Sequence, residues 1–289
     1  MNSDVHQNII KIEKKWLHTL YDYIKTGLAN VWIPSHDETH SLRVWFYACQ
    51  LFLSLEQQNI ITRLADIENA IIAIFFHDLG MSESLKPEHG IISRRKCEGF
   101  FKKNHLTKPE GFSEILDAIE YHDDKTYREF VFKDELSKTD VLTVLCISDD
   151  LDAFGLVGVY RFWEIYSLRQ IPEKIIPLKA LSSLENRFDN FSKGFSFLDN
   201  FFENQKSRFL RTRNFFSVLL NEMREIKKLN KTTYAIKVIS LLNELVLHDR
   251  QSPEIIYQLV QQKNINTNVL DFFKNFDKEY NIGQQLLIP

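Results

Sequence analysis

An all-α fold is predicted from three observations. Apolar residues recur at intervals of three and four along most of the chain, as they do on amphipathic helices. Alternation of apolar and polar residues, which would predict strands, is best represented by the short segment Glu129–Phe132. The 289 residues include only 9 Gly and 7 Pro, which argues against a turn-rich all-β fold.

The predicted helices follow one another with short polar breaks. The first is marked by Ile9, Ile12, Trp16 and Leu20, and the others are predicted near residues 44–51, 70–77, 90–103, 115–122, 142–149, 155–168, 185–203, 206–228, 232–247, 253–262 and 267–278. The basic turn Lys227–Thr232 is the one break that we interpret as a boundary. It divides residues 1–230 from a C-terminal helical extension, residues 231–289, which we expect to be dispensable for metal binding.

The composition is that of an ordinary soluble globular protein, with 44% apolar and 26% charged residues. Lys plus Arg (36) nearly balance Asp plus Glu (39), which excludes a broad electrostatic surface for nucleic acid. The N-terminus becomes polar too early for a signal peptide, and the apolar runs are too short to span a bilayer. Three cysteines without a CxxC pair indicate neither a disulfide framework nor a thiolate zinc site. We therefore expect a cytoplasmic protein with no membrane partner.

The dipeptide His77–Asp78 follows seven consecutive apolar residues, Ala70–Phe76. His77 lies four residues after Ala73, and Asp78 lies four after Ile74, so both continue apolar stripes and should point inward. Buried charge is costly unless it is paired or bound to metal. For this dipeptide alone, the ordinary interpretation is a backbone hydrogen bond or an ion pair.

Three more polar residues continue apolar stripes on other predicted helices. His40 shares a face with Val44, His122 lies three residues after Ile119, and Asp149 lies four after Leu145, with Asp152 on the same stripe. Four helices that each direct His or Asp inward imply either several unpaired buried groups or one shared cation. The shared cation is the less costly arrangement.

These residues occur in chain order as H…HD…D, formed by His40, His77–Asp78 and Asp149 within SHDETHSLRV, IAIFFHDLG and SDDLDAFGLVGVYR. The pattern resembles the HD superfamily of metal-dependent phosphohydrolases. The last segment and Phe191–Phe216 are similar to a subgroup of uncharacterised bacterial HD phosphohydrolases. The resemblance covers about residues 8–228. It implies an HD-domain helical bundle, to which the residues beyond 230 add C-terminal helices.

The resemblance also implies a ligand set for one or two divalent metal ions. His89 and His122 would match the two extra histidines of HD enzymes with two metals, although His89 is equally compatible with a solvated loop beside Pro87. Asp78 would bridge the two ions, and Asp78, His89 and His122 would take part in catalysis. The full set is His40, His77, Asp78, His89, His122 and Asp149.

Imidazole and carboxylate ligands suit Mn, Fe, Co, Ni or Zn, and Mg less well. A bound ion would activate water to attack a phosphate ester of a nucleotide or related small molecule. Arg43, Arg161 and Asp152 are the candidate substrate-binding residues, and surface ion pairs are the alternative interpretation of the two arginines. We do not expect nucleic acid as a partner, and a homodimer is compatible with the sequence.

Two other functions fit the same residues. A di-iron oxygenase of the HD fold would use the same six ligands, and a non-catalytic nucleotide-binding HD module would keep them without turnover. His36 precedes His40 by one helical turn but lies in a predicted loop, so capping or substrate contact suits it better than ligation.

Overall fold

The computed structural model describes residues 4–86, 88–124, 138–229 and 233–287. All regular elements in these ranges are helices, with no strand among them, and the all-α prediction is confirmed. The first group of α-helices comprises α1 (Asp4–Leu28), α2 (Glu38–Gln57), α3 (Leu64–Phe76), α4 (His89–Lys103), α5 (Phe112–Tyr121) and α7 (Val141–Asp152). The later α-helices are α8 (Gly155–Leu168), α9 (Ile176–Phe195), α10 (Asp199–Leu229), α11 (Tyr234–Leu242), α12 (Ile256–Gln261) and α13 (Thr267–Tyr280).

Shorter helical turns complete the described chain. These are the 3₁₀ helices η1 (Leu79–Ser82), η3 (Pro253–Ile255) and η4 (Asn281–Leu287), and the π-helix η2 (Asn243–His248). The segment Glu129–Phe132, the best strand candidate of the sequence, lies outside the described residues.

The predicted helix over residues 185–203 is wrong, because α9 ends at Phe195 and α10 begins at Asp199. Asp199 has a φ of +33°, which a right-handed helix cannot continue through. The apolar spacing does not reveal this break. Phe195, Leu198 and Phe201 are all buried and lie three residues apart, so the periodicity runs straight across the turn.

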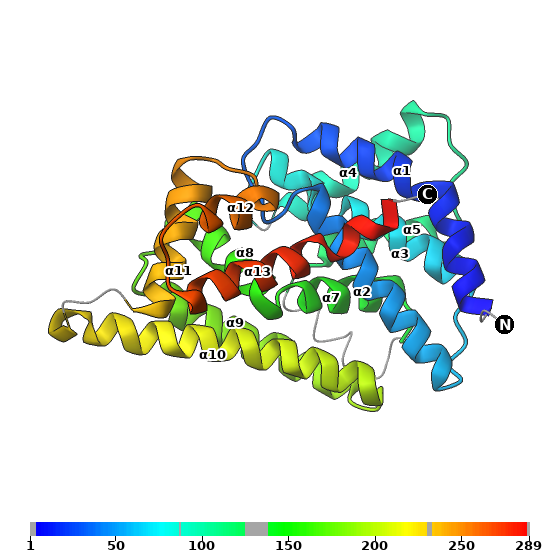
Figure 1. The fold of residues 1–289 in the computed structure, drawn as a ribbon. Coiled ribbons are helices and arrows are strands. Elements are labelled where there is room, and N and C mark those ends of the chain that lie inside the picture. The colour runs from blue at the N-terminus through cyan, green and yellow to red at the C-terminus, as the bar shows by residue number, and fades with distance from the viewer. Residues whose placement is uncertain (1–3, 87, 125–137, 230–232, 288–289) are drawn as a thin grey trace.

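The core is built around α3 and α7. Ala70–Phe76 is almost fully buried because α1, α2, α5 and α7 pack around α3, and all of α7 is buried as well. Figure 1 shows α10 running along one edge of the molecule beneath α9 and α8. These three helices pack on one another, and α8 and α9 contribute residues to the site described below.

The C-terminal extension packs against the main body. Helix α13 contacts α8, and η4 contacts α2. The Glu279 carboxylate accepts a hydrogen bond from the Leu156 amide (2.6 Å) and so caps the start of α8. Gly155, at the first position of α8, has a φ of +80°, and a Cβ there would meet the same carboxylate. The predicted boundary near 230 falls at residues 230–232, outside the described ranges, and stays a prediction. The contacts argue against a dispensable extension.

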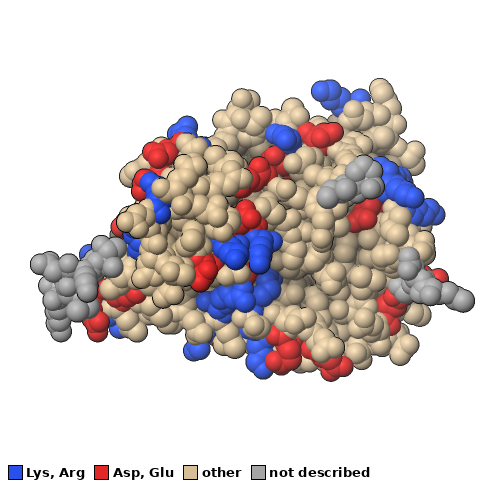
Figure 2. Space-filling view, in the orientation of Figure 1, with Lys and Arg blue, Asp and Glu red and all other residues tan. Residues whose placement is uncertain are grey.

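The surface carries both charges. Figure 2 shows acidic and basic side chains interspersed over one face of the molecule, which agrees with the near balance of charge in the sequence. Within the described residues, none of the helices has the length and apolar character needed to cross a membrane.

Candidate metal centre

The six candidate ligands lie at the ends of buried helices and in one buried helix. His40 lies in the first turn of α2, where the Asp37 carboxylate caps the helix by accepting from the amides of Thr39 and His40. His77 and Asp78 follow α3 directly, His122 follows α5, and His89 begins α4. Asp149 lies within α7. All six side chains are buried and converge on one region.

Three of these residues form the first group. His40 Nε2 lies 3.3 Å from His77 Nε2. One carboxylate oxygen of Asp78, Oδ2, lies 3.4 Å from His40 Nε2 and 3.1 Å from His77 Nε2. Asp149 approaches the same group, with its Oδ1 3.5 Å from His40 Nε2.

The second group uses the other oxygen of the same aspartate. Asp78 Oδ1 lies 3.4 Å from both His89 Nε2 and His122 Nε2, and these two nitrogens are 3.2 Å apart. Asp78 therefore lies between two pairs of histidines and directs one oxygen to each. This is the placement that a bridging carboxylate of a two-metal site requires.

The hydrogen bonds made by the Nδ1 atoms of the four histidines determine the tautomer of each ring, and therefore whether Nε2 faces the centre as an acceptor. The Nδ1 atoms of His77, His89 and His122 lie 2.7–2.8 Å from the carbonyl oxygens of Ile74, Lys86 and Ile119, respectively. A carbonyl only accepts, so each Nδ1 must carry the proton. His40 Nδ1 lies 2.8 Å from the Asp152 carboxylate and is fixed in the same way.

In the neutral imidazoles, four Nε2 lone pairs consequently face one another in two pairs. Two lone pairs at this separation repel unless a cation lies between them. Histidines whose outer N–H is held by a carbonyl or carboxylate are the usual form of metal-ligating histidine. The described residues thus include two groups, His40–His77–Asp78 and Asp78–His89–His122, that could each hold a metal ion.

Comparison with known proteins gives one match. Residues 38–154 match the family model of the HD domain. This part of the chain is therefore similar to HD domains. No curated protein and no solved structure matches the chain. The matched segment contains all six candidate ligands, whereas Arg161, Arg169 and Arg187 lie beyond it.

Both aspartates that face the histidines are held ionised. Burial alone would raise the pKa of Asp78, but the surrounding imidazoles, His77 foremost, keep it well below its usual value. Burial likewise opposes ionisation of Asp149, and Arg161 followed by Arg187 keeps the pKa of that carboxyl well below normal. The site therefore presents carboxylates rather than carboxylic acids, as metal binding requires.

Two residues expected to bind substrate lie behind the candidate ligand histidines instead. Asp152 has no exposed surface, and it accepts from His40 Nδ1 and from Arg43 Nε (2.9 Å). Arg43 is equally buried, also bonds Thr39 (3.0 Å), and stacks on the Tyr280 ring. Neither lines the pocket beside the histidines. In this structure the pair orients His40, because buried charges on one apolar face pair with each other more favourably than they face solvent.

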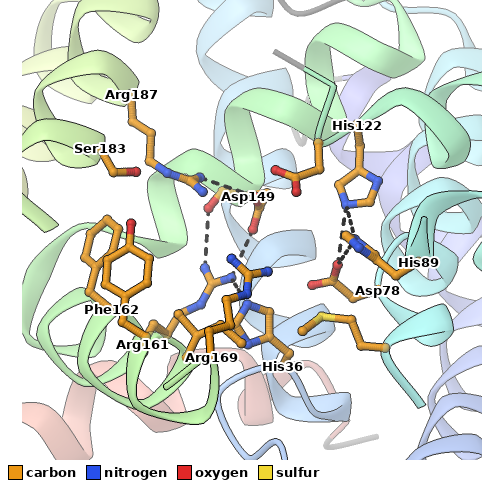
Figure 3. A pocket seen from close by; sticks show the side chains of 14 residues that line it. His36, Asp78, His89, His122, Asp149, Arg161, Phe162, Arg169, Ser183 and Arg187 are labelled. Carbon is orange, nitrogen blue, oxygen red and sulfur yellow. Dashed lines mark hydrogen bonds and ion pairs between the residues drawn. The ribbon is translucent and has the colours of Figure 1, made fainter. Parts of the chain in front are cut away.

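A pocket opens beside the candidate ligands, and arginines line it. Arg161, a candidate substrate-binding residue, lines it, with its Nη2 3.1 Å from Asp149 Oδ1. Arg187, from α9, bonds the Asp149 and Asp150 carboxylates. Arg169, at the end of α8, is exposed and has no ion-pair partner that the structure records. Figure 3 shows these arginines on one side of the pocket and Asp78, His89 and His122 on the other.

The sequence analysis missed Arg187 and Arg169. Arg187 had a detectable signal, because it lies three residues after Leu184 and four before Phe191 on a buried stripe of α9. A cation that continues an apolar stripe is as unusual as an inward-facing histidine. Arg169 is an exposed residue at a helix end, and no local pattern distinguishes it.

Proposed function

We propose that the chain is a metal-dependent phosphohydrolase that cleaves a phosphate ester of a nucleotide or a related small molecule. The observation that carries this proposal is the position of Asp78, which directs one oxygen to each of two facing histidine pairs. Arginines line the pocket beside it and match the charge of a phosphate.

The ligand chemistry fits one or two divalent metal ions. His40, His77, Asp78 and Asp149 would hold the first ion, and Asp78, His89 and His122 the second. Imidazole and carboxylate donors suit Mn, Fe, Co, Ni or Zn better than Mg. When bound, the metal lowers the pKa of a water ligand and polarises the phosphoryl oxygen.

The protein's own residues would position the ester. Arg169 has a guanidinium that no described carboxylate neutralises, so it is available to bind a phosphate oxygen. Arg161 and Arg187 already contact Asp149, and they would hold the remaining phosphate oxygens next to that carboxylate. A guanidinium can bind two phosphate oxygens at once and thus orient the phosphorus toward the histidines.

The three arginines that line the pocket, Arg161, Arg169 and Arg187, also favour this proposal over the two alternatives. An oxygenase with the same ligands has no general need for several cations around its substrate, whereas a phosphate ester does. A non-catalytic module would be expected to bind nucleotide without turnover. These differences can be measured directly.

The experiment combines metal analysis with a substrate panel. The purified chain, loaded in turn with Mn²⁺, Fe²⁺, Co²⁺, Ni²⁺ and Zn²⁺, is assayed on phosphomonoesters, phosphodiesters and nucleotides. We expect metal-dependent release of phosphate or of a nucleotide product. Asp78→Asn should abolish it, and His18→Ala, which replaces an exposed histidine that does not line the pocket, should not. Oxygen consumption without phosphate release would favour the oxygenase, and nucleotide binding without turnover would favour the module.

A further inference from the structure

A groove with a volume of about 1080 Å³ continues from the pocket beside the candidate ligands and is not explained by the metal centre. The pocket itself has a volume of only about 80 Å³. Sites that enclose small organic ligands typically measure about 300–1,000 Å³. The pocket is therefore too small for the organic part of an ester, which must lie in the groove. The residues that line both are Asp123, Tyr166, Arg169, Ser183 and Arg187.

One wall of the groove is a polar stripe along α9, whose members recur every three or four residues and so share one face of the helix. Ser183 and Arg187 lie in the middle of the stripe and also line the pocket. Figure 3 shows both on one helix, across the pocket from Asp78. Lys179 and Lys193 line the groove on either side of them, about 21 Å apart along the helix axis. The groove thus continues along α9 in both directions from the point where the pocket opens into it.

The two ends of α9 lie beside different parts of the molecule. Its first residues follow α8 after a short loop, and Arg169 at the end of α8 lines the same groove. At its other end, the Phe195 ring lies 5.6 Å from Nζ of Lys138, just before the start of α7. Between these ends, Arg187 pairs with Asp149. The metal centre therefore faces the middle of the groove rather than one end of it.

We propose that the substrate is a phosphodiester whose two organic groups lie along α9 in opposite directions from the phosphate. The inference rests on the phosphohydrolase function given above and names its substrate class. A phosphomonoester has one organic group and would fill only one end of the groove. In the hydrolysis, a water oxygen bonds to phosphorus, and the bond from phosphorus to one ester oxygen breaks. One proton of that water ends on the released oxygen, so the products are a phosphomonoester and an alcohol.

The side chains of the groove indicate that both organic groups are polar and uncharged. Asn186 and Asn190 line it, and each amide can donate and accept hydrogen bonds. Among the described residues that line the groove, carboxylates such as Glu88 and Asp124 are at least as numerous as basic side chains. The groove therefore lacks the excess of positive charge that a long polyanion requires. Two nucleosides joined by a single phosphate have the chemistry that fits it.

The test compares diesters with the monoesters derived from them. The parent is assayed on the dinucleoside monophosphates of thymidine and of adenosine, and on the 3′- and 5′-monophosphates of the same nucleosides. Ser182→Trp and Lys193→Trp each place a bulky ring in one end of the groove, because these exposed residues line it on opposite sides of Arg187. Leu178→Trp is the matched control, since Leu178 is exposed on the same helix and does not line the groove.

We expect kcat/KM of the parent to be at least ~10-fold higher on the diesters than on the monoesters. Ser182→Trp and Lys193→Trp should each raise KM for the diesters by at least ~10-fold, whereas at most one of them should do so for any given monoester. Leu178→Trp should match the parent, and all three variants should keep the metal content and melting temperature of the parent.

Three results would overturn the diester inference alone. These are a parent that hydrolyses the monoesters or other phosphate esters better than these diesters, an unchanged KM for the diesters in Ser182→Trp or Lys193→Trp, and a monoester whose KM both substitutions raise. A parent that hydrolyses no phosphate ester would overturn the phosphohydrolase proposal and the diester inference with it.

Discussion

The guanidinium of Arg43 lies 4.7 Å from the centre of the Tyr280 ring, so the C-terminal helix reaches the residues that orient His40. Tyr280 also shares a hydrogen bond with Thr39 (2.9 Å) in the first turn of α2. Arg43 in turn bonds Asp152, which fixes His40 Nδ1. The extension beyond residue 230 thus supports the candidate metal centre from behind.

Replacing Tyr280 by Leu should weaken metal binding. Loss of the ring frees Arg43 and loosens Asp152 and His40, and residues that hold metal ligands typically affect affinity by ~10–100-fold. Phe276→Leu is the matched control, because Phe276 is buried on the same helix, and its recorded ring contacts are with Tyr160 and Tyr280 rather than Arg43. Calorimetric titration with Mn²⁺ checks this. Equal affinities in the two variants, at equal melting temperatures, would show that α13 contributes only packing.

Asp149→Asn should lower both metal affinity and turnover by at least roughly tenfold, or about 1.4 kcal/mol. The inward-facing carboxylate is compensated even without metal, because Arg161 and Arg187 pair with Asp149. We therefore expect the metal-free variant to lose about 1–3 kcal/mol of unfolding free energy.

Asp150→Asn separates the two effects of that substitution. Asp150 neighbours Asp149 and shares Arg187, but only Asp149 contacts a candidate ligand, His40, in the recorded contacts. The Asp150→Asn variant should lose a similar amount of unfolding free energy and keep the metal affinity of the parent. If both variants lose metal equally, Asp149 is a structural residue rather than a ligand.

Arg169→Ala should raise KM for the phosphate ester by roughly tenfold with a smaller change in kcat. Arg169 is exposed and has no recorded ion-pair partner, so the melting temperature should stay at the parent value. Arg224→Ala removes another exposed arginine, which does not line the pocket, and should change neither quantity. Steady-state kinetics on all three proteins make the comparison, and an unchanged KM in Arg169→Ala would remove this residue from the substrate site.

Glu164→Gln should become more stable relative to the parent as pH rises. Burial raises the pKa of the Glu164 carboxyl to about 8 in the folded protein, against about 4.3 in the unfolded chain. Between these values the folded state holds a proton that the unfolded state has lost. Parent stability therefore falls with pH in this window, by at most about 1.4 kcal/mol per unit. Urea unfolding of both proteins at about pH 6 and about pH 8 measures the difference. A constant difference would mean that Glu164 is already ionised in the folded protein.

The sequence indicated that the candidate ligands turn inward because they break a local rule. His40, His77, His122 and Asp149 each continue an apolar stripe, and that conflict is visible within a few residues of chain. Contacts between residues that are distant in the sequence leave no such local pattern. The Arg43–Asp152 pair and the Tyr280–Thr39 bond join distant segments, and a helical stripe specifies which side chains turn inward but not which residue each one meets.

The most direct test of the account is the number of metal ions per chain. We expect about two Mn²⁺ per parent chain by plasma mass spectrometry after equilibration and desalting. His89→Ala combined with His122→Ala should retain about one, and Asp78→Ala, which removes the bridge between both histidine pairs, should retain less than one. A parent that binds no metal, or an Asp78→Ala variant that keeps the parent's stoichiometry, would contradict the two-metal centre on which the account rests.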